Sequence, residues 1–131
     1  MKILAYSIIV ALLLVPYQTW AEDYDGTKPL LCASVEAISC EPGEPCEKGT
    51  PEGIGAPQFM RSDFSRKEIV GPKRTTPIRL TEKTDEQVTL QGFELGMGWT
   101  FTIDRTNGKM AATLIGREAS FVIFGACTPL Q

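Results

Sequence analysis

The chain has 131 residues, a formal net charge of −3 and no histidine. The absence of histidine excludes Ser-His-Asp triads, Cys-His dyads and histidine metal ligands, and we expect neither a cofactor nor a metal site. A weakly acidic chain without a basic run is also a poor candidate for binding nucleic acid.

Residues 1–21 have the charge and hydrophobicity pattern typical of a cleaved signal peptide. Lys2 gives a cationic start, Ile3–Val15 is largely apolar, and Ala21 places a small residue before the acidic Glu22. The apolar run is shorter than the ~20 residues that span a bilayer. We therefore predict cleavage after Ala21, a periplasmic or secreted protein, and no membrane span after cleavage.

The remaining chain is predicted to form a short flexible acidic arm at 22–28 and one domain at 29–131. Glycine and proline recur throughout this domain and no long window keeps a helical period, which favours β-structure. We expect eight strands, at 31–40, 58–64, 68–71, 77–82, 86–93, 98–104, 109–116 and 120–127. Short turns between them predict an all-β, eight-stranded antiparallel meander, closed into a small β-barrel or left partly open, with a sandwich as the alternative.

The four cysteines of an exported chain of this size indicate two disulfides. Cys40 and Cys46 bracket a turn-rich Glu-Pro-Gly-Glu-Pro spacer, so we expect these two to pair. Cys32 and Cys127 then remain, near the two ends of the domain. In a meander with an even number of strands, both fall at the same end of the first and last strands, so their pairing fits barrel closure.

A glycine-flanked stretch at 92–98 is the candidate binding loop. It carries Phe93, Leu95 and Met97 beside Trp99. Exposed, these side chains would form an apolar patch of the kind used for binding. The alternative is that they cover the open end of the barrel.

Charge is unevenly distributed along the chain. Arg66, Lys67, Lys73 and Arg74 form a candidate basic patch for an anionic ligand, whereas residues 22–52 are mostly acidic. The acidic hairpin between the paired cysteines would suit a cationic partner. The alternative in both cases is an ordinary solvated surface.

Paired carboxylates are the one catalytic pattern that this composition leaves open, because glycoside hydrolysis requires only two Asp or Glu residues. The candidates are Asp63, Glu94 and Asp104. We expect Asp104 to accept backbone N–H groups at the start of a turn, and Asp63 to pair with a neighbouring arginine. No catalytic residue is therefore assigned.

The segment Trp99–Thr128 contains an Ile-Asp-x-x-x-Gly hairpin at Ile103–Gly108, followed by a strand and a terminal Gly-x-Cys. Together with Leu30–Ala33, it resembles an uncharacterised group of small exported bacterial proteins. This resemblance implies a Gram-negative periplasmic setting and no activity. Size and compartment are also similar to those of the periplasmic lysozyme inhibitors, which are small disulfide-containing barrels, although their Ser-Gly-x-x-Tyr loop is missing.

These observations predict a monomeric, non-enzymatic binding or interaction module for an unknown small ligand or periplasmic protein. One alternative is an inhibitor of a lysozyme-type enzyme, acting through the Cys40–Cys46 hairpin or the loop at 92–98. The other is a small hydrolase that uses Asp63 and Asp104.

Overall fold

The computed structural model describes residues 23–131, so the predicted signal peptide lies outside the described residues. This part of the chain is all-β, apart from one short 3-10 turn, η1 (Glu52–Ile54). Its ten strands are β1 (Leu30–Cys40), β2 (Glu47–Gly49), β3 (Phe59–Asp63), β4 (Glu68–Val70), β5 (Thr75–Pro77), β6 (Leu80–Lys83), β7 (Gln87–Glu94), β8 (Met97–Asp104), β9 (Lys109–Ile115) and β10 (Ser120–Pro129).

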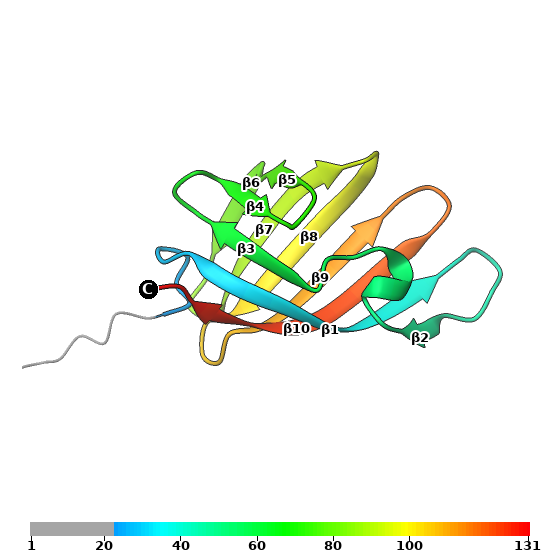
Figure 1. The fold of residues 1–131 in the computed structure, drawn as a ribbon, viewed down its shortest axis with the longest axis horizontal. Helices are drawn as coiled ribbons and strands as arrows, with labels where there is room; N and C mark the ends of the chain where they lie inside the picture. Colours follow the sequence, from blue (N-terminus) through cyan, green and yellow to red (C-terminus); the bar gives the residue numbers. More distant parts are fainter. Residues whose placement is uncertain (1–22) are drawn as a thin grey trace, which may run out of the picture.

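The strands form one antiparallel sheet in the order β5-β4-β3-β1-β10-β9-β8-β7-β6, and β2 adds to β1 beyond the end of β3. In this order each strand pairs with its neighbour as in an up-and-down meander, and the first and last long strands, β1 and β10, pair with each other. The sheet is open between β5 and β6. The sheet curls into the half-barrel of Figure 1. The predicted all-β antiparallel architecture, partly open rather than closed, is confirmed.

The strand count is ten rather than the predicted eight. One additional strand, β2, exists because β1 extends past β3 and offers a free edge on which residues 47–49 pair with residues 37–39. The other, β5, arises because residues 75–83 bend instead of forming one strand. These short paired segments lack a hydrophobic alternation of their own, so periodicity does not detect them.

The bend between β5 and β6 brings the two edges of the sheet together. The Ile78 N–H donates to the Lys67 carbonyl at 2.8 Å, and the next N–H, that of Arg79, donates to the Gln91 carbonyl at 2.8 Å. The chain therefore crosses from the β4 side to the β7 side within two residues. This crossing covers part of both sheet edges, which would otherwise present unpaired backbone groups.

Side chains reinforce the same crossing. The Trp99 indole N–H donates to Thr76 Oγ1 at 3.2 Å, and the Thr76 hydroxyl donates to the Phe93 carbonyl at 3.1 Å. Gly92 makes room for the buried indole, because a Cβ at this position would lie 2.4 Å from Trp99 Cζ2. Trp99 is thus a core residue whose one polar group is satisfied at the opening of the half-barrel.

Both predicted disulfides are confirmed. Cys32 and Cys127 are direct cross-strand partners on β1 and β10, with Cα atoms 3.9 Å apart, and both are buried. Cys40 and Cys46 are joined at the far end of β1. The buried bridge lies within the concave core, whose other hydrophobic members are Leu30, Ala37, Met60, Ile69, Ile78, Val88, Leu90, Trp99, Phe101, Ile103, Met110, Ala112 and Ile123.

Residues 23–28 pack against the end of the half-barrel, where we had expected a flexible arm. The Tyr24 ring lies over Gly108, at which a Cβ would approach it to 2.4 Å. Lys83 Nζ donates to the Gly26 carbonyl at 3.3 Å. The tyrosine ring and this hydrogen bond hold the polar segment against the domain, and composition alone does not reveal these contacts. In residues 23–131 we find no helix with the length and apolar character needed to cross a bilayer.

Removing the Cys32–Cys127 bridge by double replacement with alanine should lower the free energy of unfolding by about 4–5 kcal/mol, since it closes a loop across 95 positions. Removing Cys40–Cys46, which spans 6 positions, should cost only about 2 kcal/mol. Urea unfolding of both variants measures this difference. Equal losses would contradict a dominant role for the bridge between β1 and β10.

Gly92→Ala should destabilise the fold by about 1–3 kcal/mol, because the new methyl group overlaps the Trp99 indole. Urea unfolding followed by tryptophan fluorescence reports both stability and the indole environment. Gly49→Ala is the control, because nothing lies within 4 Å of a Cβ built there. A neutral Gly92→Ala variant would contradict the packing described.

Candidate functional site

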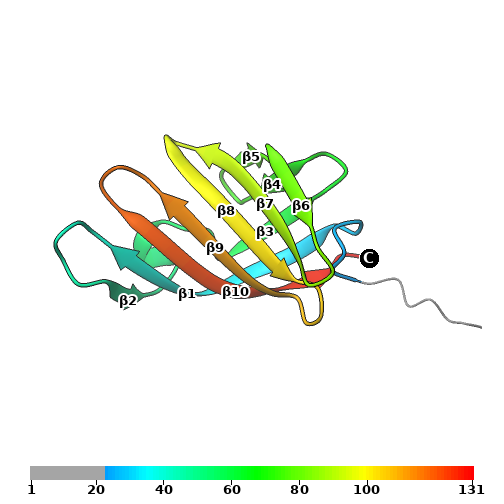
Figure 2. The ribbon, with the colours of Figure 1, turned by 180° about the vertical axis from the view of Figure 1, so that it is seen from behind.

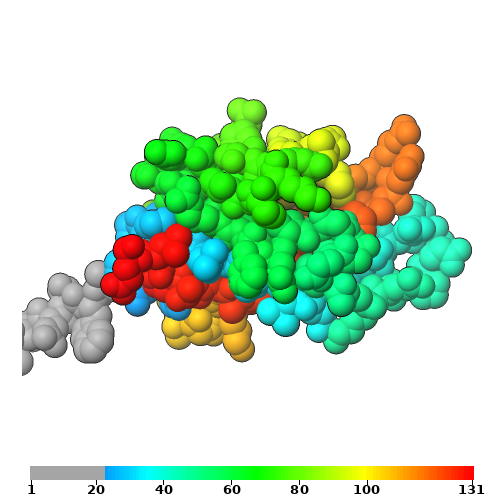
Figure 3. All heavy atoms as spheres, viewed as in Figure 1, coloured from blue at the N-terminus to red at the C-terminus, as the bar shows by residue number. Residues whose placement is uncertain are grey.

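Three turns project from one end of the half-barrel, which we call the hairpin end. They are the β1–β2 loop (41–46), the β7–β8 turn (95–96) and the β9–β10 turn (116–119). Figure 2 shows them fanning outward, and Figure 3 shows the β1–β2 and β9–β10 tips standing out from the body of the molecule. Strand register brings them together, since one cross-strand row runs through Phe93, Gly98, Ile115, Ser120 and Cys40.

A depression of about 330 Å³ lies on the outer face of β6–β9 at this end. Its walls include Leu80, Phe93 and Ile115, whose exposed fractions are 54%, 71% and 61%. Gly98 contributes no side chain to it, and a Cβ there would lie 3.8 Å from the Phe93 ring. We call this depression the apolar groove. An exposed apolar depression of this kind is typical of an interaction surface.

Two side chains of the candidate binding loop are exposed, and the other two are fully or partly buried. Phe93 and Leu95 point outward and are 71% and 72% exposed. Trp99 is buried in the core, and Met97 is half-buried, near the position that a Cβ on Gly116 would occupy. The reversal of the chain at 95–96 places the first pair on the outside and the second pair on the inside.

Leu95 occupies a strained backbone position at the tip of the β7–β8 turn. Its φ is 51° and that of Gly96 is 76°, so both central residues of the turn are left-handed. Such turns favour Asn or Gly at these positions, and a left-handed leucine costs about 1 kcal/mol. The side chain also gains little from burial. Strain and exposure at one residue, without benefit to the fold, are features of functional sites.

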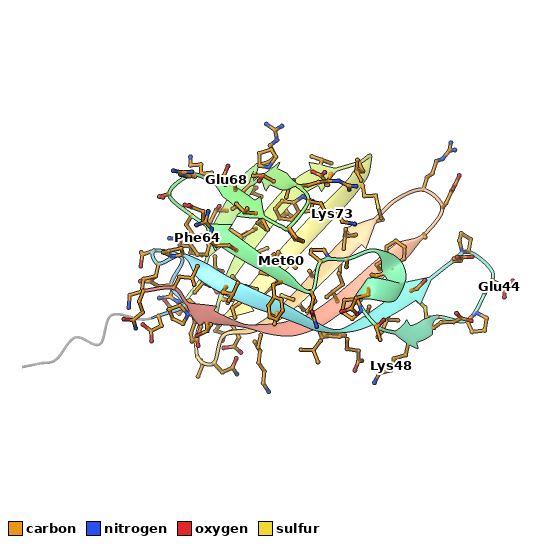
Figure 4. The ribbon with its side chains drawn as sticks, viewed as in Figure 1. Glu44, Lys48, Met60, Phe64, Glu68 and Lys73 are labelled. Atoms are coloured by element: carbon orange, nitrogen blue, oxygen red, sulfur yellow. A yellow bond between two sulfur atoms is a disulfide. The ribbon has the colours of Figure 1, made fainter. Side chains whose placement is uncertain are left out.

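The loop between the paired cysteines, Glu41–Pro45, is fully exposed; we call it the acidic loop. Figure 4 shows Glu44 at its far tip. The Cys40–Cys46 bridge, two prolines and a Glu44 N–H to Glu41 carbonyl bond of 3.3 Å restrict its motion. A second depression, of about 310 Å³, separates this loop from the β9–β10 turn, and Ile115 borders both depressions.

The four cations of the candidate basic patch form two separate pairs. Arg66 and Lys67 lie in the β3–β4 turn, whereas Lys73 and Arg74 lie in the β4–β5 turn. These turns flank opposite ends of β4, as the positions of Glu68 and Lys73 in Figure 4 show. The second pair, which we call the basic turn, directly precedes β5, whose Thr76 hydroxyl donates to the Phe93 carbonyl.

Two of the three candidate carboxylates, Asp63 and Asp104, act in local turns. Asp63 accepts hydrogen bonds from the Arg66 N–H at 3.0 Å and the Ser65 hydroxyl at 2.8 Å. Asp104 accepts the Thr106 N–H at 2.7 Å. The two residues lie on β3 and β8, with β1, β10 and β9 between them in the sheet. Asp63 therefore interacts with the Arg66 backbone, whereas we had expected a pairing with an arginine side chain.

Those hydrogen bonds hold the pKa of Asp63 below its usual value, first through the Arg66 N–H and then through the Ser65 hydroxyl. A general acid requires the opposite shift, because it must keep its proton near neutral pH.

Sequence reasoning missed Leu80 and Ile115, two further apolar residues of the groove. They come from β6 and β9 and share a surface with Phe93 only through strand register. The alternation of outward positions was available from the sequence, but the pairing that aligns them was not.

Comparison with protein-family models, with curated proteins and with solved structures found no match for this chain.

Asp63→Ala should lose stability in a pH-dependent way. A lowered pKa in the folded state means that the carboxylate stabilises the fold above the ordinary value of 3.8, and that this contribution disappears as pH falls through the lower folded value. Urea unfolding should therefore separate the variant from the unmodified protein at about pH 7 but not at about pH 2. A carboxyl that titrates above 3.8 by NMR would contradict the turn-capping role.

Proposed function

We propose that this protein is an exported, non-catalytic interaction module that binds a partner macromolecule through its hairpin end. The binding surface consists of the apolar groove, the Leu95 tip and the acidic loop. Its two disulfides, one buried and one at the edge of this surface, are compatible with an oxidising compartment outside the cytosol. Cleavage of residues 1–21 remains part of the proposal.

The observation that carries this proposal is the pair of exposed apolar side chains at the β7–β8 turn. Phe93 and Leu95 are each more than two-thirds exposed and lie beside a groove with apolar walls. Burial of such side chains contributes about 1.5–3 kcal/mol each, which is the scale of an interface anchor. The groove is open and small, so it suits side chains of a partner better than an enclosed small ligand.

A non-catalytic role is supported by the state of the carboxylates. Asp63 and Asp104 each accept hydrogen bonds within their own turns. The lowered pKa of Asp63 favours a permanently ionised group. Hydrolase activity is therefore less well supported than a role as an interaction module.

Inhibition of an enzyme is the second candidate function, and the acidic loop is the specific observation that favours it. The loop protrudes, carries Glu41 and Glu44, and is held by the Cys40–Cys46 bridge. A restrained loop loses little conformational entropy on binding, which is an advantage for insertion into a cleft. Its charge would select an enzyme with a cationic cleft.

Site-specific photo-crosslinking in the native compartment tests the proposed function. A photo-reactive amino acid replaces Phe93 in one variant and Val35 in the other, because both side chains are 71% exposed in the isolated chain. Val35 lies on β1, away from the groove-lining strands β6–β9. We expect a discrete crosslinked species from position 93 and at least ten times less from position 35. Equal crosslinking, or none at position 93, would overturn the assignment of the hairpin end.

A further inference from the structure

The charges of this chain are segregated within the fold. Residues 59–77, which form β3, β4 and β5 with their two turns, contain five lysines and arginines and only two acidic residues. We call this part of the sheet the basic wing. Its net charge is +3, whereas the whole chain carries −3, so the rest of the sequence carries −6. A positive region on an otherwise acidic protein directs the molecule toward anionic surfaces.

The cations of the basic wing are open to solvent. All are exposed, and within residues 23–131 none forms an ion pair: Arg61, Arg66, Lys67, Lys73 and Arg74. The two acidic residues of the wing, Asp63 and Glu68, lie at the end of the β3–β4 turn, where Asp63 accepts the Ser65 hydroxyl. No acidic residue lies in 69–77, so the positive charge of the basic turn is not offset by an acidic neighbour in the wing.

The cations are spread over the wing and do not converge on one point. Arg66 and Lys67 precede β4, whereas the basic turn follows it. β4 has three residues, so the two pairs are separated by about 10 Å of strand. A single phosphate or carboxylate group cannot contact both pairs across that length. Neither of the two depressions described above is lined by a cation of the wing. This distribution fits an extended anionic surface better than a small anion held in a pocket.

An exposed aromatic side chain accompanies these cations on β3. Phe59 and Arg61 lie on the outer face of this strand, because the alternating residues Met60 and Ser62 are buried. The Phe59 side chain is 53% exposed and its strand partner is the small Ala33 on β1. A surface with cations beside an exposed aromatic ring is typical of proteins that lie on a membrane, where the ring enters the boundary between headgroups and acyl chains. A soluble polyanion has no apolar layer to receive the ring.

We propose that the basic wing docks the exported protein on the surface of a bilayer that contains anionic lipids. Lipid phosphates contact the five cations, and Phe59 enters the headgroup region. The same surface repels the acidic remainder of the chain, which orients the molecule with the wing toward the bilayer. Figure 3 shows the wing as the green front of the molecule and the acidic loop as the cyan tip at the right. This inference uses other residues than the hairpin end and does not depend on the proposed function.

Co-sedimentation of the exported, oxidised protein with lipid vesicles measures the docking. The vesicles consist of phosphatidylcholine alone or of phosphatidylcholine with one-third phosphatidylglycerol, which is anionic. We expect binding to be at least tenfold tighter with the anionic vesicles, and this preference should disappear as salt rises, because exposed charges are screened. Equal binding to the two kinds of vesicle, or binding to neither, would overturn the proposal.

Charge reversal locates the contact within the wing. Lys73→Glu with Arg74→Glu reverses the basic turn, and Arg61→Glu with Arg66→Glu reverses the outer face of β3 and the β3–β4 turn. Each variant should bind the anionic vesicles at least tenfold more weakly, because an extended surface contacts both ends of β4 at once. A loss in only one of the two folded variants would indicate a local anion site and overturn the extended surface.

The matched control is Lys48→Glu with Arg117→Glu. It changes the net charge by the same amount and replaces two exposed cations outside the wing that already pair with Glu36 and Glu118. This control should bind the anionic vesicles nearly as tightly as the unmodified protein. An equal loss in the control would mean that net charge decides binding, and would overturn the wing as the docking surface. Far-ultraviolet circular dichroism verifies the fold of every variant.

Phe59→Ser separates a bilayer from other anionic partners. This variant should bind anionic vesicles several-fold more weakly and bind soluble dextran sulfate as the unmodified protein does, because only a bilayer receives the ring. Binding of the unmodified protein to dextran sulfate but not to the vesicles would overturn the bilayer in favour of a soluble polyanion. A photo-crosslink from position 61 to a discrete protein in the native compartment would overturn it in favour of an acidic protein. Crosslinking from position 93 tests the hairpin end separately, so either proposal can fail without the other.

Discussion

Pairing of the first long strand with the last is the constraint on which the rest of this structure depends. Ten residue pairs join β1 to β10, and the Cys32–Cys127 bridge locks them at a buried position. This pairing turns a row of hairpins into a curled sheet, because strands added on either side must bend round toward each other. It places the opening between β5 and β6, the two strands farthest from β1 and β10 in the order of the sheet.

The character of the hairpin end follows from that closure. β1 is longer than its neighbour β3, so its far half projects and carries the acidic loop away from the body. The crossing at residues 78–79 brings β5 beside the end of β7. The apolar groove on β6–β9 shares Ile115 with the depression that borders the acidic loop.

Much of the architecture was predictable from residue patterns. Cysteine spacing and the even number of long strands predicted both disulfides, and alternation in 98–104 predicted the strand that the structure shows as β8. The short strands β2 and β5 were not predictable, because pairing on a free edge rather than hydrophobic period creates them. The site was half predictable. Phe93 and Leu95 were identified from their glycine-flanked stretch, but Ile115 joins them only through strand register.

The proposed function requires that the hairpin end is covered in the native compartment. Hydroxyl-radical footprinting there tests it most directly, because Leu95 and Val35 are 72% and 71% exposed in the isolated chain and therefore equally open to solvent. We predict that the modification rates of Leu95 and Phe93, each divided by that of Val35, fall several-fold from the isolated chain to the native compartment. Unchanged ratios would contradict the claim.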